Sequence, residues 1–263
     1  MNAEALLAWY ERVRRPLPWR ETRDPYALLV SEVMLQQTQA ARVVPYYEAF
    51  LAAFPTPAAL AAAPPADVLR AWSGLGYNRR ALALQRAARE VAQRGWPADL
   101  TELPGVGPYT TAAVASFAFG AQVAAVDTNL RRVIERRDGV RRRPGALAER
   151  AAELLPDGRA AEFNQAMMEL GATVCRPRRP GCAACPVSDG CASAGRAEAP
   201  RARRGGARRF EDSDRWARGR IVAALVAGEP PPALDRARRE RAEAGLVRDG
   251  LAVRRPDGAL ALP

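Results

Sequence analysis

The sequence predicts a mostly α-helical protein with a small C-terminal α/β extension. First, 263 residues of which 48% are hydrophobic suffice for two packed units with a substantial core. Second, apolar residues recur at helical spacing along most of the chain, and no clear strand pattern precedes residue 190. Third, two short strand-like segments flank a Pro-Asp-Gly turn near the C-terminus.

Start signals and apolar spacing place the elements in order. Asp24-Pro25 joins a capping residue to a proline at the first helical position, which predicts a helix from residue 25 to about 37. A second helix is expected after Thr38, which can cap it. Further helices are expected at 65–72, 79–93, 108–120, 127–137, 160–174, 214–228 and 233–245, and strands at 250–255 and 259–263.

The chain has a formal net charge of +11. An excess of this size favours a polyanionic partner, and nucleic acid is the most plausible one. All 40 basic residues are arginine, which is typical of a GC-rich genome. A solvated surface shaped by codon bias is the alternative, but codon bias does not explain the positive sign.

Two residue types are absent, and their absence limits the chemistry. Without histidine the chain has no imidazole base and no histidine metal ligand. Without lysine it cannot form a Schiff base through a side chain. No apolar run approaches the roughly 18–20 residues of a transmembrane helix, and the N-terminus lacks a signal-peptide core. We therefore expect a monomeric, cytoplasmic protein with no membrane partner.

The only cysteines lie within 17 residues: Cys175, Cys182, Cys185 and Cys191. Without a secretion signal, disulfides are not expected. Zinc usually takes two Cys-x2-Cys pairs from separated segments, whereas one compact loop with a single such pair suits a [4Fe–4S] cluster better. We expect a [4Fe–4S] cluster, with zinc as the alternative. The simplest role for the metal centre is to fold the loop.

The segment 103–107 reads Leu-Pro-Gly-Val-Gly and runs into a helix of small residues. Its glycines can adopt positive φ angles, so it can form a tight hairpin between two helices. Backbone N–H groups of Gly105, Val106 and Gly107 can then bind phosphate without reading base sequence. An ordinary helix–helix turn would explain the same residues.

Several segments together resemble a known family of DNA repair enzymes. The hairpin, an aspartate about twenty residues later in AVDTNLRRV, and the C-x6-C-x2-C-x5-C loop occur in this order. This order is similar to the helix–hairpin–helix DNA glycosylases with an iron–sulfur loop, the endonuclease III and MutY group. From about Trp9 to Cys191, resemblance to the MutY-type adenine glycosylases rests on PLPWR, DPYALLVSEVMLQQTQ, GLGYNRRALAL, LPGVGPYT and FNQAMMELGATVC.

The resemblance implies the helix–hairpin–helix DNA glycosylase fold of two helical lobes. The C-terminal extension, expected to be winged-helix-like, is too short for the full Nudix-like domain that many adenine glycosylases carry. The expected parts are a lobe of residues 1–24 and 115–195 with the iron–sulfur loop at 175–191, a lobe of residues 25–114 with the hairpin at 103–114, a basic linker at 196–210, and the extension at 211–263.

The implied reaction is hydrolysis of the N-glycosidic bond of adenine paired with 8-oxoguanine or guanine in double-stranded DNA. In a bacterial cell this substrate implies association with the nucleoid. Such an enzyme must flip the base out, protonate the departing purine and stabilise the sugar cation with an anion. Two carboxylates in different environments are therefore expected.

Glu32 fits the role of the acid that protonates the departing purine. It shares a helix face with Leu28, Leu29 and Leu35, and an apolar surrounding would raise its pKa. Spacing alone equally allows a boundary residue that faces solvent or pairs with arginine. In the MutY family, the glutamate at this place in SEVMLQQT protonates the adenine.

Asp127 fits the anion, although it can also simply cap the next helix, whose N–H groups would keep it ionised. The resemblance gives it the stabilisation of the sugar cation, with Asn129 in support. Thr128 stands where the adenine enzymes usually have glycine. Tyr109 occupies the place of the lysine in bifunctional lyases, and a tyrosine forms no imine. We therefore expect a monofunctional glycosylase without efficient strand cleavage.

The resemblance also points to residues that bind the base and the DNA. Gln37 corresponds to the wedge that fills the gap opposite the flipped base, and Tyr77 to a contact with the opposite strand. Core packing is the alternative for Trp19 and Leu35. The expected binding residues are Trp19, Arg20, Arg23, Leu35, Gln36, Gln37, Tyr77, Gly105, Val106, Gly107 and Gln165.

Two other functions are weighed against this one. A glycosylase for mismatched thymine or uracil, or for damaged pyrimidines, is disfavoured because mismatch-thymine relatives lack a glutamate at the place of Glu32. A catalytically silent iron–sulfur DNA-binding module would need neither Glu32 nor Asp127, and both are present.

Overall fold

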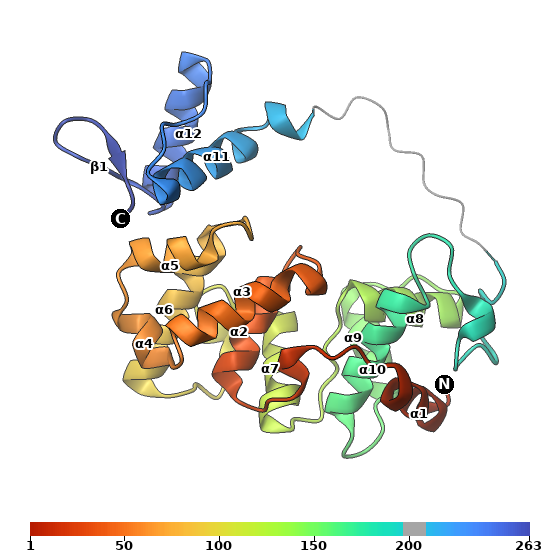
Figure 1. Cartoon of the computed structure of the whole chain (residues 1–263). Helices are drawn as coiled ribbons and strands as arrows, with labels where there is room; N and C mark the ends of the chain where they lie inside the picture. Colours follow the sequence, from red (N-terminus) through yellow and green to blue (C-terminus); the bar gives the residue numbers. More distant parts are fainter. Residues whose placement is uncertain (197–208) are drawn as a thin grey trace. The chain divides into compact units, whose positions relative to one another are not determined.

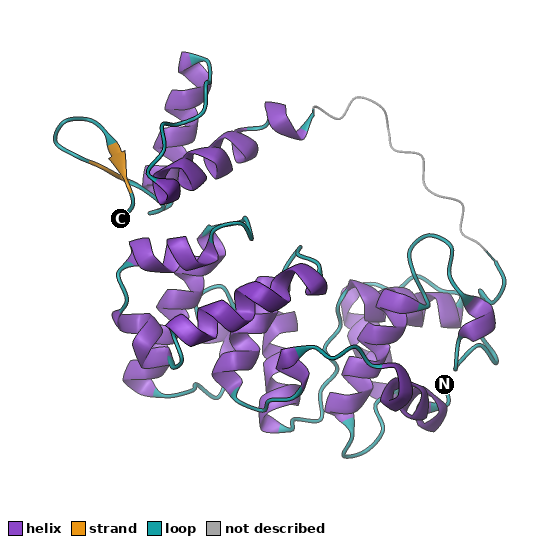
Figure 2. Cartoon of the chain, viewed as in Figure 1, coloured by secondary structure: helices purple, strands orange, loops and turns teal. Residues whose placement is uncertain are grey.

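The structure, a computed structural model, describes residues 1–196 and 209–263 and is mostly helical, as predicted (Figure 1, Figure 2). Its α-helices are α1 (Ala3–Val13), α2 (Pro25–Leu35), α3 (Ala40–Ala53), α4 (Pro57–Ala62), α5 (Pro65–Trp72), α6 (Arg79–Arg94), α7 (Pro108–Phe119), α8 (Thr128–Asp138), α9 (Pro144–Glu153), α10 (Ala160–Thr173), α11 (Asp214–Ala227) and α12 (Arg236–Arg248). Its short 3-10 helices are η1 (Pro18–Arg20), η2 (Leu100–Glu102), η3 (Cys182–Ala184) and η4 (Phe210–Asp212), and its strands are β1 (Val253–Arg254) and β2 (Leu260–Ala261).

Local capping chemistry determines where several helices begin. The Asp24 carboxylate accepts hydrogen bonds from the Tyr26 and Ala27 N–H groups at 3.0 and 3.2 Å, which starts α2 where the sequence predicts it. The prediction that Thr38 caps the next helix is wrong. Gln39 occupies that position without a side-chain bond, because the Thr38 hydroxyl donates to the Gln36 carbonyl instead.

The chain divides into two compact units, each built from two separate stretches. The first comprises Met1–Glu32 and Val106–Ala202, and the second comprises Val33–Gly105 and Arg203–Pro263. These boundaries differ from the lobe boundaries expected from the sequence, because α2 and the hairpin each supply residues to both units. The C-terminal extension belongs to the second unit.

The first unit is organised around α10, which packs against α1, α7 and α8. Asn164 on α10 is fully buried. Its amide donates to the Val123 carbonyl at 2.8 Å and accepts from the Ala125 N–H at 3.0 Å. These bonds fix the extended segment that leads into α8, and therefore the position of Asp127. The core includes Leu6, Tyr10, Leu130, Ile134, Phe163, Met167 and Leu170.

In the second unit, α6 packs against α4 and α5. Trp72 is fully buried and meets Phe50 edge-to-face, with 5.9 Å between the ring centroids. The buried Gln85 amide on α6 donates to the Leu60 and Ala63 carbonyls at 3.2 and 2.6 Å, which satisfies carbonyls at the end of α4.

The C-terminal extension consists of the helix pair α11 and α12 and a short hairpin. The antiparallel ladder pairs Val253 with Ala261 and Arg254 with Leu260, so the predicted small strand pair is confirmed, although each strand is shorter than expected. The linker expected at 196–210 falls largely on residues 197–208, which lie outside the described part of the chain.

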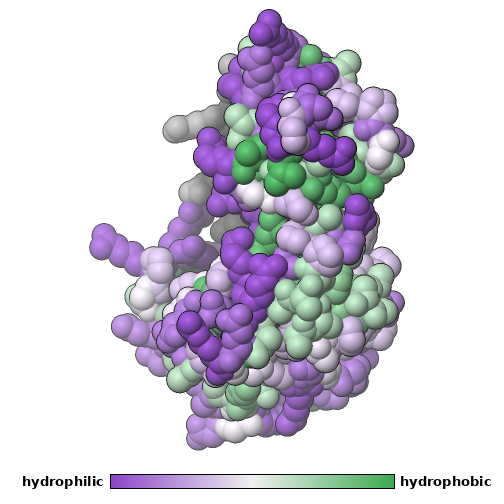
Figure 3. Space-filling model, turned by 90° about the vertical axis from the view of Figure 1, so that its left-hand side faces the viewer, coloured by the Kyte–Doolittle hydropathy of each residue, from purple (hydrophilic) through white to green (hydrophobic). Residues whose placement is uncertain are grey.

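On the face shown in Figure 3, most side chains are hydrophilic. On the same face, apolar side chains gather in a band across the upper part of the view, among polar ones. None of the helices within the described ranges combines the length and the apolar character that a bilayer span requires.

Candidate active site

Glu32, near the C-terminal end of α2, is a buried carboxyl group with few polar neighbours. It is 4% exposed, and its Oε2 atom has no hydrogen-bond partner among the described residues. Burial raises the pKa of Glu32 from 4.5 to about 7. The negative charge of Asp127 adds to this rise, and a hydrogen bond with the Tyr109 hydroxyl opposes it. Glu32 can therefore hold a proton near neutral pH and deliver it to a bound molecule.

Asp127 caps α8. Its Oδ1 accepts from the Asn129 and Leu130 N–H groups at 2.9 and 2.7 Å, and its Oδ2 accepts from the Asn129 side-chain amide at 2.6 Å. Contrary to the expectation that such bonds dominate, burial outweighs them and raises the pKa of Asp127 above its usual value of 3.8. The carboxylate is thus held rigidly and is sparsely solvated, which strengthens its interaction with a nearby cation.

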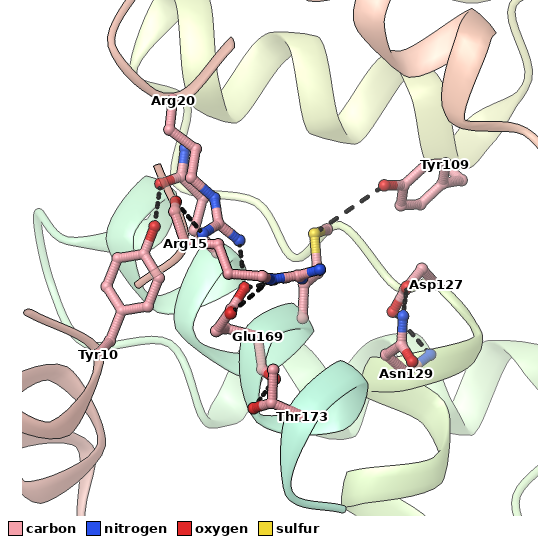
Figure 4. A network of polar contacts seen from close by, with 10 residues as sticks. Tyr10, Arg15, Arg20, Tyr109, Asp127, Asn129, Glu169 and Thr173 are labelled. Atoms are coloured by element: carbon pink, nitrogen blue, oxygen red, sulfur yellow. Dashed lines mark hydrogen bonds and ion pairs between the residues drawn. The ribbon is translucent and has the colours of Figure 1, made fainter. Parts of the chain in front are cut away.

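Tyr109 stands in the first turn of α7. Its hydroxyl lies 4.0 Å from the Met168 sulfur (Figure 4). Burial raises the pKa of Tyr109 well above 10, and the charges of Glu32 and Asp127 add to the rise. The phenol therefore stays protonated and acts as a hydrogen-bond donor. Residues 32, 109, 127 and 129, all singled out from the sequence, lie together in the first unit.

Arg132 holds Asn129 in place. Its guanidinium donates to the Asn129 Oδ1 and to the Gly171 carbonyl, both at 2.7 Å, and to the Cys175 carbonyl at 2.8 Å. A Cβ on Gly171 would lie 2.5 Å from the Asn129 Cβ, so this approach of α10 to α8 requires glycine. Asp127 is thereby connected through hydrogen bonds to the start of the cysteine loop. Arg132 was not predicted from the sequence, in which only the spacing Asp-Thr-Asn-x-x-Arg indicates it.

Arg20 and Gln165, both expected in the binding pocket, take part in one network of contacts, of which Figure 4 labels Arg20, Tyr10 and Glu169. The Arg20 guanidinium donates to Glu169 at 2.6 Å and lies 5.4 Å from the centroid of the Tyr10 ring. The Tyr10 hydroxyl donates to the Gln165 Oε1 at 2.8 Å. These residues come from α1, η1 and α10, so three segments converge at this place.

Glu169 is a second buried carboxylate and was not predicted from the sequence. It is fully buried and pairs with Arg15 at 2.7 Å and with Arg20. Burial alone would raise the pKa of Glu169, but the hydrogen bonds and charges of both arginines hold it below its usual value. This group is therefore an ionised anchor for Arg20, in contrast to Glu32.

The other expected pocket residues differ in their surroundings. Trp19 is 6% exposed and lies in the buried part of the first unit. Arg23 is exposed, and the structure does not bring it to the network around Glu169. Leu35 is partly buried at the end of α2, in the second unit.

Gln36, Gln37 and Tyr77 lie in two loops of the second unit that contact each other. Gln37 and Tyr77 have φ angles of 59° and 50°, a region that non-glycine residues rarely adopt. The Tyr77 hydroxyl donates to the Gln37 side chain. Arg80 joins the loops, because it donates to the Gln36 and Gly76 carbonyls at 2.7 and 3.1 Å.

Of the two hairpin glycines, Gly105 and Gly107, only Gly105 adopts the positive φ angle that glycine makes possible. Gly105 has a φ of +81°, and a Cβ there would lie 2.8 Å from the Ala83 side chain. Gly107 is in an extended conformation and occupies the N-cap position of α7, ahead of Pro108. Gly107 does not use the positive φ that glycine allows, because the turn is completed at Gly105. The free N–H groups of the first turn of α7 remain a suitable anion site.

All four cysteines are free thiols and partly buried. Burial raises the pKa of Cys185, a backbone hydrogen bond from Val187 opposes the rise, and the charges of Cys175, Cys191 and Cys182 add to it. Within residues 1–196 and 209–263, no group of three or more histidine, cysteine, aspartate or glutamate side chains is arranged to hold a metal ion. As a donor set, four soft thiolates in one loop are what an iron–sulfur cluster takes, one for each iron.

Arginines of α8 support the cysteine loop. Arg136 donates to the Arg176 carbonyl at 2.8 Å and to the Pro177 carbonyl at 3.1 Å. Arg137 donates to the Val187 and Asp189 carbonyls at 3.0 and 3.1 Å. The two ends of the loop are therefore fixed to the helix that Asp127 caps.

Comparison with known proteins adds to this geometry. The profile of the HhH-GPD superfamily of base excision DNA repair proteins matches residues 30–157. The chain is 44% identical to the adenine DNA glycosylase of Mycobacterium tuberculosis H37Rv, over 98% of this chain and 92% of that protein. It is 42% identical to the human adenine DNA glycosylase, over 74% of this chain and 39% of that protein.

Solved structures show the same fold. A thermostable thymine-DNA glycosylase is 35% identical, with a TM-score of 0.65 over 70% of this chain and 90% of that one. A trapped covalent intermediate of endonuclease III with DNA is 24% identical, with a TM-score of 0.62 over 70% of this chain and 89% of that one.

Proposed function

This chain belongs to the adenine DNA glycosylase family of helix–hairpin–helix base excision repair enzymes, and we propose that it acts on adenine mispaired with 8-oxoguanine or guanine. The observation that carries the proposal is Glu32. A buried carboxyl with a pKa of about 7, next to a rigid aspartate, matches the acid and the anion that purine release requires.

Glu32 delivers its proton to a ring nitrogen of the extruded adenine. The bond between C1′ and the base then breaks, and its electron pair leaves with the adenine. The positive charge left on the sugar is stabilised by Asp127, which Asn129 and the α8 N–H groups hold in place. Water adds to C1′, and the proton it releases restores Glu32, so that the products are adenine and an abasic site.

The enzyme is monofunctional in this proposal. Lyase chemistry needs an amine that attacks C1′, and the chain has no lysine. Tyr109 supplies a phenol that stays protonated. The remaining amine is the N-terminal one, at Met1. Burial lowers the pKa of this amine, and so does the charge of Arg137 at the C-terminal end of α8, whereas Asp138 raises it. Asp127 caps the opposite end, about 15 Å away along this helix.

The four cysteines bind a [4Fe–4S] cluster in this proposal, because their donor type, their number and their spacing in the sequence fit one. The bound cluster would link Cys175, Cys182, Cys185 and Cys191 and hold the loop in one fold. The Arg132 and Arg136 hydrogen bonds would then transmit the position of the loop to α8. An absorption band near 400 nm with about four irons per chain is expected, and stoichiometric zinc without iron would reject the cluster.

The decisive experiment measures release of free base under single-turnover conditions. Duplexes carry A:8-oxoG, A:G, T:G or an oxidised pyrimidine, and products are scored with and without alkali. Adenine release from the first two duplexes, with strands cut only after alkali, is expected. Release of another base without adenine release would overturn the substrate assignment. Strand scission without alkali would overturn the monofunctional assignment.

Thymine release from mismatches is the second candidate, because a thymine-DNA glycosylase shares the fold and a third of its residues with this chain. Glu32 separates the two candidates, since thymine departs from a mismatch without a need for protonation at a purine ring nitrogen. The T:G duplex in the same experiment tests this alternative.

A further inference from the structure

One arginine holds the two loops that carry strained residues in the second unit. Gln37 and Tyr77 have φ angles of 59° and 50°, and their side chains share a hydrogen bond. Arg80, in the first turn of α6, donates to the Gln36 carbonyl at 2.7 Å through Nη1 and to the Gly76 carbonyl at 3.1 Å through Nη2. The guanidinium therefore bridges two loops that lie 40 positions apart in the chain.

The two acceptor carbonyls belong to the residues that directly precede the strained ones. Each carbonyl lies in the planar peptide group whose orientation sets the φ angle of the next residue, Gln37 in one loop and Tyr77 in the other. Strain of this kind lowers the population of such a conformation by about 5- to 150-fold unless the surroundings hold it. Arg80 constrains both residues at once, with one nitrogen of its fork for each loop.

Arg80 is itself fixed by its surroundings. Its guanidinium lies 5.3 Å from the centroid of the buried Trp72 ring and 5.2 Å from that of the Tyr77 ring. Its Nη1 also donates to the Val33 carbonyl in the last turn of α2 at 2.6 Å. Burial lowers the pKa of Arg80 to about 10, so the group remains charged at neutral pH. The fork is thus held in one plane between α2 and the two loops.

This arrangement costs stability. The Nε group of Arg80 is buried and has no hydrogen-bond partner among the described residues. An unsatisfied buried donor destabilises a fold, and so do two left-handed residues that are not glycine. Such features gather where the geometry serves a function. The Gln37 side chain is exposed, and its loop follows α2, which ends three residues after Glu32.

We propose that Arg80 is a positioning residue for base extrusion, which holds the Gln37 and Tyr77 side chains in place to enter the duplex where the adenine leaves it. This inference rests on the proposed function, because an adenine that reaches Glu32 leaves a gap in the duplex close to the end of α2. Side chains that are already ordered lose little freedom when they fill such a gap, so extrusion becomes easier. Arg80 acts through the two loops and takes no part in proton transfer.

The test measures single-turnover adenine release by the wild type and by Arg80→Lys on two duplexes. Both contain an A:G mispair, and in one of them the pairs on either side are pyrimidine–pyrimidine mismatches, which make extrusion easier. Lysine keeps the charge, but its single nitrogen cannot divide its donors between the two loops as the fork does. The ratio of the rate on the regular duplex to the rate on the weakened duplex should fall by at least about fivefold, the smallest effect of one strained residue.

Arg86→Lys is the matched control, because Arg86 is an exposed arginine on the same helix, and it should keep the wild-type ratio. A loss of folded enzyme would slow both reactions alike and leave the ratio unchanged. An unchanged ratio in Arg80→Lys, or an equal fall of the ratio in Arg86→Lys, would therefore overturn the inference. Absence of adenine release by the wild type would instead contradict the proposed function.

A second measurement follows extrusion without catalysis. 2-Aminopurine placed beside the target adenine gains fluorescence when its stacking is broken, and Glu32→Gln protein at saturating concentration should produce this gain. The double variant Glu32→Gln, Arg80→Met lacks the donors of the fork but keeps an apolar stem. Its gain at saturation should be smaller, and a gain equal to that of Glu32→Gln alone would refute the positioning role.

Discussion

Replacement of Glu32 with glutamine separates the proton that this residue supplies from the destabilisation that its burial causes. With a pKa of about 7, the wild-type carboxyl is about half protonated at pH 7 and about one-tenth protonated at pH 8. The general-acid step should therefore slow by about tenfold as the pH rises from about 6 to 8. Glutamine cannot supply the proton, and loss of a general acid lowers rates by about 10²- to 10⁴-fold.

The same shift sets the pH dependence of stability. The pKa of Glu32 rises on folding from 4.5 to about 7, so the native state favours the protonated form. This contribution is fully present below pH 4.5 and is lost as the pH rises through about 7. Between about pH 5 and pH 8, the linkage relation gives a loss of roughly 2–3 kcal/mol in the wild type. The glutamine variant does not share this loss.

Two assays check both consequences. Single-turnover adenine release is measured from about pH 5.5 to 8.5, and urea unfolding is measured at about pH 5 and pH 8. Glu229→Gln, at an exposed position on the loop after α11, is the matched control for both. A glutamine variant that keeps more than about a tenth of the wild-type rate would refute the role of Glu32. A wild-type rate that does not change between about pH 6 and pH 8 would refute the raised pKa.

Three further substitutions test other parts of the molecule. Glu169→Gln leaves the buried Arg20 without its full partner and should lower the free energy of unfolding by about 3–5 kcal/mol in urea titrations; a change below about 1 kcal/mol would contradict the anchor role. Gly105→Ala, at a φ of +81°, should weaken duplex binding several-fold in fluorescence titrations, and an unchanged affinity would exclude the hairpin as a DNA contact. Asn129→Ala removes the 2.6 Å bond to Asp127 and should slow adenine release by about tenfold without a change in DNA affinity, whereas an unchanged rate would show that the α8 N–H groups suffice.

Local patterns were enough to predict most of the helices, the strand pair and the centre of the candidate site, although α1, α4 and α9 were not among the helices expected. Asp24-Pro25 starts a helix because a cap and a proline act within one turn. The burial of Glu32 follows from its place on an apolar stripe of the same helix. Asp127 was predicted as a cap because Asp-Thr-Asn precedes a helical pattern, and the structure gives it this role.

Long-range contacts were beyond the sequence. Glu169 pairs with arginines about 150 positions away, and no local rule separates it from a solvent-exposed glutamate. Arg132 acts through carbonyls of α10, whose position depends on the close approach at Gly171. The Arg215 guanidinium of α11 lies over the Tyr77 ring, and this contact depends on how the C-terminal extension packs within the second unit. Such contacts depend on tertiary packing, which periodicity and capping signals do not encode.

Selection for stability would treat the two buried carboxylates of the first unit, Glu32 and Glu169, in opposite ways. Glu32 lacks a partner for one oxygen, whereas Glu169 has two arginines. A library screened for thermal stability alone would accept neutral replacements of Glu32 and reject those of Glu169. The most stable members of such a library would then be inactive, although their fold and DNA affinity would be intact. Selection on this scaffold must therefore include a catalytic readout, with Glu32 kept fixed.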